Sequence, residues 1–87
     1  MRVTRELEGT FGKSSVIEHS RIEIRVSKKF EMDSNDVPVY AAALIMVPHY
    51  QCKPSEIAAF TEALAAAKAE AEWLDENYPT GQKLFKD

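Results

Sequence analysis

The sequence predicts an α+β fold: a three-stranded antiparallel β-meander followed by one long C-terminal helix packed on one face (β-β-β-α). Three observations carry this prediction. Residues 20–32 alternate apolar and polar side chains, residues 37–47 form an apolar run between prolines, and residues 54–77 place apolar side chains at helical spacing. Alternation is typical of a half-buried strand, and a spacing of three and four is typical of a helix with one buried side.

The chain of 87 residues is short enough to be one domain. We expect residues 1–79 to form a single small α+β domain and residues 80–87 to form a polar C-terminal tail. Within that tail, Leu84 and Phe85 can contact the surface. A domain of this size has a thin core, and some chains of this size gain the missing burial by oligomerising.

The first strand is expected at residues 2–11. Arg5 and Gly9 interrupt its apolar phase, as in an edge strand with a bulge. The sequence Gly-Lys-Ser-Ser at 12–15 is typical of a turn, so a hairpin should follow.

The second strand should run over residues 20–32, with one dry and one wet face. Lys28 is the one residue that breaks its apolar phase. A cluster of Asp, Ser and Asn at 33–36 predicts the next turn, because these side chains bond their own backbone. The dry face would hold Ile22, Ile24 and Val26.

The run VPVYAAALIMV at 37–47 is the most apolar stretch of the chain. As a strand it is apolar on both faces, because successive side chains point in opposite directions. With a turn centred near Asn35, its even-numbered face joins the dry face of the second strand. A short helix is the competing interpretation, since Ala, Leu and Met are good helix formers. The expected strand pairs are Phe30 with Tyr40, Val26 with Leu44, and Ile24 with Met46.

One long helix is expected to begin at Pro54, which suits the first helical position, or at Ser55 as a capping residue. It should end near Asn77, where Tyr-Pro-Thr-Gly follows. Its apolar stripe would cross the even-numbered face of the sheet, although the same spacing also fits a coiled-coil seam. The members of the stripe are Ile57, Phe60, Leu64, Ala67, Ala71, Leu74 and Tyr78.

The odd-numbered face of residues 37–47 has no second helix to cover it, so it predicts a protein interface. Exposed apolar patches on small proteins usually mark interfaces, and an uncovered edge strand invites pairing. Trp73 lies beside the helix stripe and is a candidate anchor. The alternative is that the tail or the connection 49–53 folds over this face. The candidate interface residues are Val39, Ala41, Ala43, Ile45, Val47 and Trp73.

A net charge of −3 argues against a general nucleic-acid binder, whose affinity rests on basic surface. The alternative function is nevertheless a nucleic-acid-binding regulator that uses the basic edge of the second strand, since two-stranded ribbons can enter the major groove. Glutamates interleave with this positive charge, which weakens that alternative. Its residues would be Arg21, Arg25, Lys28 and Lys29.

The single cysteine, Cys52, excludes an intrachain disulfide. His49 and Cys52 have a spacing found in zinc sites, but a structural site needs four ligands, and only His19 and carboxylates remain. A nucleophilic Cys–His pair would need a cleft that a domain this small does not easily build. We therefore expect no metal, no cofactor and no enzymatic activity.

The start of the chain, MRVTRELEG, lacks the apolar segment of a signal peptide. No apolar run approaches the ~20 residues that span a bilayer. Together with the single cysteine, these observations predict a cytoplasmic protein without a membrane partner.

These patterns favour a small non-enzymatic protein–protein interaction module that works as a homodimer or larger assembly, or with a partner protein. In size and charge the chain is similar to small accessory proteins of phages and mobile elements, many of which bind and inhibit host proteins, although no motif carries this similarity. The acidic helix surface could imitate phosphate charge and occupy a basic groove. Its members are Glu62, Glu70, Glu72, Asp75 and Glu76.

Overall fold

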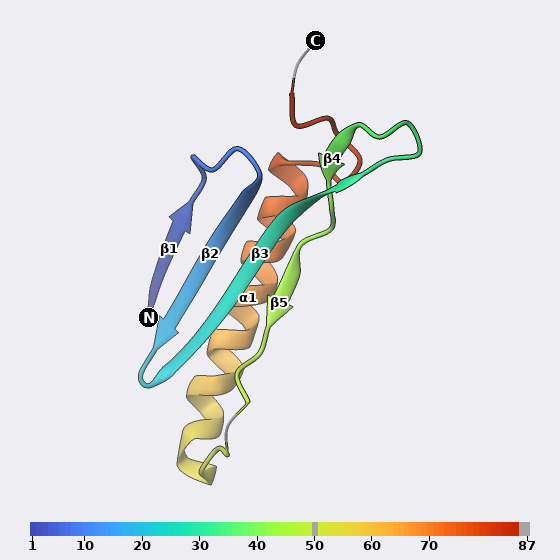
Figure 1. Cartoon of the computed structure of the whole chain (residues 1–87). Coiled ribbons are helices and arrows are strands. Elements are labelled where there is room, and N and C mark those ends of the chain that lie inside the picture. The colour runs from blue at the N-terminus through green and yellow to red at the C-terminus, as the bar shows by residue number, and fades with distance from the viewer. Residues whose placement is uncertain (50, 86–87) are drawn as a thin grey trace.

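The protein is an antiparallel sheet with one C-terminal helix lying along one face of it, as the computed structural model shows for residues 1–49 and 51–85 (Figure 1). This arrangement confirms the α+β class and the position of the helix. The sheet has five strands rather than the predicted three, in the order β1-β2-β3, and both β4 and β5 pair with β3. The elements are β1 (Arg2–Glu6), β2 (Gly12–His19), β3 (Ile22–Met32), β4 (Pro38–Tyr40), β5 (Leu44–Met46), the 3-10 turn η1 (Pro54–Glu56) and α1 (Ile57–Asn77).

The predicted turn at residues 12–15 is wrong, because these residues form the beginning of strand β2. The hairpin turn lies later, between the paired residues His19 and Ile22, where Ser20 has a φ of 57°. The sequence around Ser15 is typical of a loop, yet Ser15 is fully buried. Its hydroxyl is satisfied there because it donates a hydrogen bond to Glu70 Oε1 at 2.9 Å. Glu70 on α1 thus provides the hydrogen-bond partner that lets the polar Ser15 lie in the central strand β2.

The first strand is shorter than predicted and ends at Glu6. Gly9 lies in the following loop, where an added Cβ would sit 2.7 Å from the carbonyl oxygen of Gly12. Lys13 fastens this loop, because its Nζ donates hydrogen bonds to the carbonyl oxygens of Leu7 and Gly9 at 2.6 and 2.7 Å. The loop therefore closes through a lysine and a glycine rather than through a bulge in the strand.

The apolar run at 37–47 forms two short strands with a change of register between them. The prediction that Phe30 pairs with Tyr40 is confirmed for β4. In β5, however, Val26 pairs with Ile45 and not with Leu44, so the predicted register there is wrong by one residue. One residue of slip moves every side chain to the opposite face of the sheet. Ile45 therefore shares the helix-facing side with Val26, and Leu44 lies on the open face.

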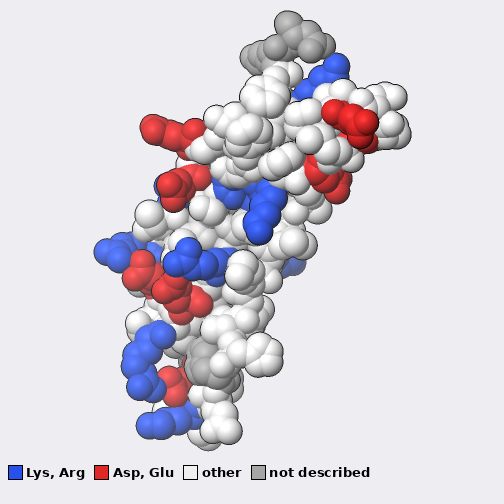
Figure 2. Space-filling model, viewed as in Figure 1, with Lys and Arg blue, Asp and Glu red and all other residues white. Residues whose placement is uncertain are grey.

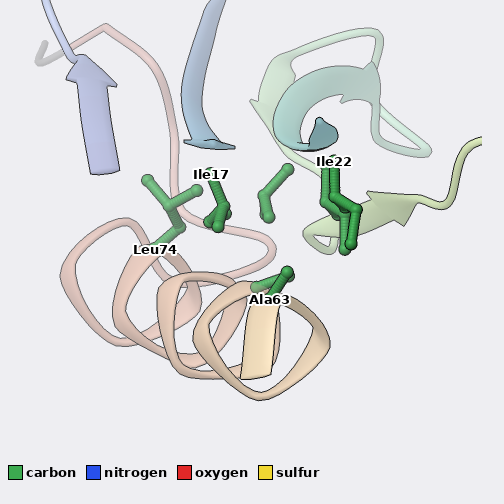
Figure 3. Packing of buried hydrophobic residues seen from close by; sticks show 7 residues of the cluster. Ile17, Ile22, Ala63 and Leu74 are labelled. Atoms are coloured by element: carbon green, nitrogen blue, oxygen red, sulfur yellow. The ribbon is translucent and has the colours of Figure 1, made fainter. Parts of the chain in front are cut away.

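The core lies between the sheet and α1 (Figure 3), and the helix contributes mainly small side chains to it. The predicted end of the helix at Asn77 is confirmed, and Pro54 opens the turn that precedes it. The buried side differs from the predicted stripe, because it includes Ala63 and Glu70, while Ile57 is exposed. Alanines let the helix backbone approach the strands closely. The buried cluster comprises Ile17, Ile22, Ile24, Val26, Ala63, Ala67 and Leu74.

The molecule is elongated, with extents of 51 × 21 × 17 Å. The long β3 and the long α1 run side by side, and β3 with β4 extends past the end of the helix (Figure 1). Within residues 1–49 and 51–85, no helix combines the length and the apolar character needed to cross a membrane.

Candidate interaction surface

The outer edge of β5 presents four consecutive apolar side chains to solvent. The exposed fractions are 64% for Leu44, 38% for Ile45, 57% for Met46 and 49% for Val47. Figure 2 shows charged groups interleaved over the open face of the sheet, whereas the side where β5 lies is mostly uncharged. Such a contiguous apolar edge is uncommon on a protein that works alone.

The other edges of the sheet are protected. The edge strand β1 carries Arg2, Arg5 and Glu6, and charged side chains discourage strand pairing. The outer side of β4 is occupied by the C-terminal segment, because the N–H of Tyr40 donates to Gln82 O at 2.9 Å and that of Leu84 donates to Pro38 O at 3.1 Å. No such backbone hydrogen bond reaches the outer side of β5 from any part of the chain that the structure describes. Thus β5 is the unprotected edge.

The position of β5 is set by a buried ion pair between Lys28 on β3 and Asp75 on α1. The Lys28 side chain is fully buried, and its Nζ lies 2.6 Å from Asp75 Oδ1. Between the paired segments, three residues of the β4–β5 side stand against two of β3, which is a one-residue bulge. Lys28 Nζ donates to Ala41 O at 2.8 Å, and the N–H of Ala43 donates to Asp75 Oδ1 at 2.9 Å. The ion pair therefore satisfies the backbone groups that the bulge frees.

The hydrogen bond from Lys28 holds the pKa of Asp75 below its usual value, and the N–H of Ala43 acts in the same direction. Desolvation opposes both effects. The carboxylate therefore stays ionised at neutral pH and keeps the buried ammonium paired. Because the bulge turns Leu44 and Met46 onto the open face, this ion pair decides which apolar side chains the edge displays.

A second polar cluster joins β1, β2 and α1 on the far side of the helix from β5. Arg5 donates two hydrogen bonds to Glu70, Nε to Oε1 at 2.8 Å and Nη2 to Oε2 at 2.9 Å. These bonds are the largest cause of the lowered pKa of Glu70, to which the Ser15 hydroxyl also contributes. The Arg5 guanidinium also lies 3.6 Å from the centroid of the Trp73 ring. This cluster fastens the exposed strand β1 to the helix.

The predicted interface residues do not form one continuous strip. Val39 is buried, with 5% of its surface exposed, and it forms a β-bridge with Lys83. Ala41 and Ala43 are half-buried beside the bulge, so Ile45 and Val47 are the members that remain exposed on this edge. The physical reasons are the register change and the C-terminal segment, which pairs with the edge of β4.

Trp73 is half-buried and packs against the core, between Arg5 and the ring of Tyr78. The two ring centroids are 6.4 Å apart. Its indole therefore closes the β1 side of the core, and it does not lie on the same side of the helix as β5.

The four basic residues of the alternative function are not brought together. Lys28 is buried against the helix, while Arg25 belongs to the opposite face of β3. Arg25 forms an ion pair with Glu23 at 2.9 Å, and Arg21 forms one with Glu56 at 3.1 Å. Lys29 is exposed. The surface that was expected to be basic is thus largely neutralised by neighbouring glutamates.

The residues considered for metal binding have other surroundings. His19 Nε2 lies 2.7 Å from Glu62 Oε2, and Cys52 is a half-buried free thiol whose Sγ donates to Lys53 O at 3.5 Å. His49 is exposed. In the described portion of the chain, no three His, Cys, Asp or Glu side chains come together in a way that could hold a metal ion.

A second exposed apolar group lies at the end of the sheet beyond the helix. The Phe11 ring packs at a tilt against Phe30, with ring centroids 5.2 Å apart, and edge-to-face against Phe85, with centroids 5.9 Å apart. Met32, on the same end of β3, is 57% exposed. These side chains are about as exposed as those of β5, but the C-terminal segment occupies the outer side of β4 at this end, so the group lacks the open strand edge that β5 has.

Sequence reasoning assigned Leu44 and Met46 to the core, although they are the most exposed residues of β5. The signal that could have found them is the Ala-Ala-Ala sequence at 41–43, opposite the one lysine that breaks the apolar phase of β3. A charged residue on a dry face needs partners, and the backbone groups of a bulge can supply them.

Comparisons with protein-family models, with curated proteins and with solved structures find no match to this chain. The geometry of the exposed β5 edge is therefore the basis for inferring a function.

Proposed function

We propose that this protein is a non-enzymatic protein–protein interaction module whose binding element is the outer edge of β5. One observation carries the proposal: β5 is an uncharged, apolar edge strand on a sheet whose other edges are charged or covered. Edge strands of this kind bind by adding a strand of the partner to the sheet. Main-chain hydrogen bonds supply affinity, and Leu44 and Met46 supply apolar contacts on the open face.

The surroundings of β5 fit an interface with an apolar centre and a polar rim. On the open face, Met46 lies beside Arg25, and Leu44 lies beside Ser27. Interfaces commonly have this organisation, with charged groups kept at the margin.

The proposed module acts in the cytoplasm, because its one cysteine, Cys52, is a free thiol and such thiols persist in a reducing compartment.

Site-specific photo-crosslinking tests this function in the cells that produce the protein. A photoreactive amino acid at Met46 should give a crosslinked protein product, whether the partner is another copy or a different protein. Val3 is the matched control, since it is 43% exposed and lies on β1, at the opposite edge of the sheet from β5. No product from position 46, or equal products from both positions, would show that the β5 edge is not the binding element.

A further inference from the structure

We propose that the occupant of the β5 edge is a second copy of this chain, with the two β5 strands pairing antiparallel about a two-fold axis at Ile45. This inference rests on the proposed function and names its partner. Isologous pairing of this kind presents the same surface from both copies. The two sheets become one continuous sheet, with both α1 helices on the same face.

The sequence of the β5 edge is self-complementary. With the axis at Ile45, Ile45 faces Ile45 of the second copy. Leu44 of each copy faces Met46 of the other, which gives two equivalent pairs. One residue further out, Ala43 faces Val47. Every facing pair is apolar, and residues 41–47 contain no charge that pairing would bury. Pro48 lacks an N–H and bounds the strand at that end, which limits the registers available.

Self-pairing would also cover the apolar side chains on both faces of β5. Leu44 and Met46 of both copies would form one four-residue apolar cluster on the open face, where each is now more than half exposed. The two Ile45 side chains would meet on the helix-facing side, where α1 contacts β5. Arg25 and Ser27, beside this cluster on β3, would form its polar rim. Both faces of β5 would thus be covered at once.

The chain exposes more surface than a folded monomer of its mass is expected to expose. The accessible surface of one chain is 6071 Å². A folded monomer of 9.8 kDa is expected to expose about 5,200 Å². The larger surface reflects the elongated shape, and a standard interface buries roughly 800 Å² on each partner. An elongated chain with an apolar edge therefore has the surface to form a stable pair.

The test is disulfide crosslinking of the purified full chain, in a Cys52→Ser background so that each variant carries one thiol. Facing Cα atoms of paired strands lie ~4.5–5.5 Å apart, within the range that a disulfide bridges. Ile45→Cys should therefore give a covalent dimer under mild oxidation. Leu44→Cys should crosslink at least tenfold more slowly, because Leu44 and its own copy are diagonal neighbours about 7–8 Å apart. The double variant Leu44→Cys, Met46→Cys should restore fast crosslinking.

Val3→Cys is the control on the opposite edge strand. Val3 is 43% exposed and Ile45 is 38% exposed, so collisions in solution affect both thiols similarly. Rapid dimer formation by Ile45→Cys alone among the three single variants supports the proposal. Equal rates for Ile45→Cys and Val3→Cys, or a faster rate for Leu44→Cys, would overturn it.

The two proposals fail in different ways. If the crosslinking rates overturn self-pairing while the photoreactive group at Met46 captures another protein, the interaction function stands and the partner is not a second copy. If position 46 captures nothing at all and Ile45→Cys does not crosslink, both proposals fail.

Discussion

Lys28 and Asp75 form an ion pair of unequal burial: the lysine side chain is fully buried, whereas 44% of the aspartate side chain is exposed, with 2.6 Å between Nζ and Oδ1. The pair lies at the bulge between β4 and β5 and bonds the backbone of Ala41 and Ala43. It therefore connects the stability of the fold to the display of the β5 edge.

Because the two side chains differ in burial, removing one or the other should lower the free energy of unfolding by different amounts. Asp75→Ala leaves a buried ammonium without its carboxylate, which should lower the free energy of unfolding by about 3–5 kcal/mol. Lys28→Met leaves a carboxylate that water can reach, so the expected loss is smaller, about 1–3 kcal/mol, chiefly from the unpaired Ala41 carbonyl. Urea denaturation at one fixed protein concentration measures both. Glu76→Ala is the control, since Glu76 is exposed on the same helix. Equal losses for the two variants would contradict the assigned geometry.

The cluster of Arg5 and Glu70 should matter more than an exposed ion pair on the same strand. Arg5→Ala removes two hydrogen bonds from Glu70, which is nearly buried, and should cost about 1–3 kcal/mol. It also uncovers the Trp73 ring, so the fluorescence of this single tryptophan should shift to longer wavelength. Arg2→Ala breaks only the exposed pair with Glu18, so it should change the stability much less than Arg5→Ala and leave the emission unchanged.

Stability should fall in acid because Asp75 and Glu70 have lowered pKa values in the folded protein. Both carboxyls bind protons more tightly in the unfolded chain, where their pKa values are about 4. Their contribution is therefore complete above about pH 5 and is lost as the pH falls through the lowered folded values. Urea denaturation between pH 7 and pH 2 measures the decline. Glu70→Gln should lessen the steepness of that decline, and an unchanged slope would show that Glu70 does not contribute to it.

Gly81 holds the C-terminal segment against β4 in a conformation that favours glycine. Its φ is +88°, and its N–H donates to Tyr40 O at 2.8 Å. Gly81→Ala should cost about 1–2 kcal/mol from backbone strain alone, because an added Cβ would touch nothing. Hydrogen exchange at the Tyr40 amide should accelerate, since that amide bonds Gln82 O. Gly12→Ala, where the Cβ would make an ordinary contact, serves as the control and should leave this exchange unchanged.

Local patterns were sufficient for the elements whose burial depends on their neighbours in sequence. The alternation around Ile24 predicted β3, and the helical spacing that ends near Asn77 predicted α1. They were insufficient where a distant residue changes the character of a position. Ser15 can be buried in β2 because its hydroxyl bonds Glu70, and Lys28 can be buried in the core because its ammonium bonds Asp75. Neither partnership is visible in a short window.

The exposed apolar edge lies within residues 37–47, but its exposed side chains differ from the predicted set. The sequence pointed to residues 37–47 as the apolar run with too little cover, and Ile45 and Val47 are indeed exposed. The predicted faces of β5 were exchanged, because the bulge at residues 41–43 shifts the register and depends on Lys28 together with its distant partner Asp75. Cover for Val39 comes from the C-terminal segment, which pairs through its backbone and so leaves little trace in its side chains.

The central claim, that β5 edges pair with one another, is tested most directly by sedimentation equilibrium of two charged variants. The double variants Leu44→Lys, Met46→Lys and Leu44→Glu, Met46→Glu each place like charges opposite one another across the two-fold axis, which destabilises strand pairing. Each should sediment alone as a 9.8 kDa monomer. Mixed in equal amounts they should form a dimer of twice that mass, because every lysine then faces a glutamate. Pairing through β5 would be contradicted if the mixture remains monomeric. It would also be contradicted if either double variant alone dimerises as well as the unmodified protein.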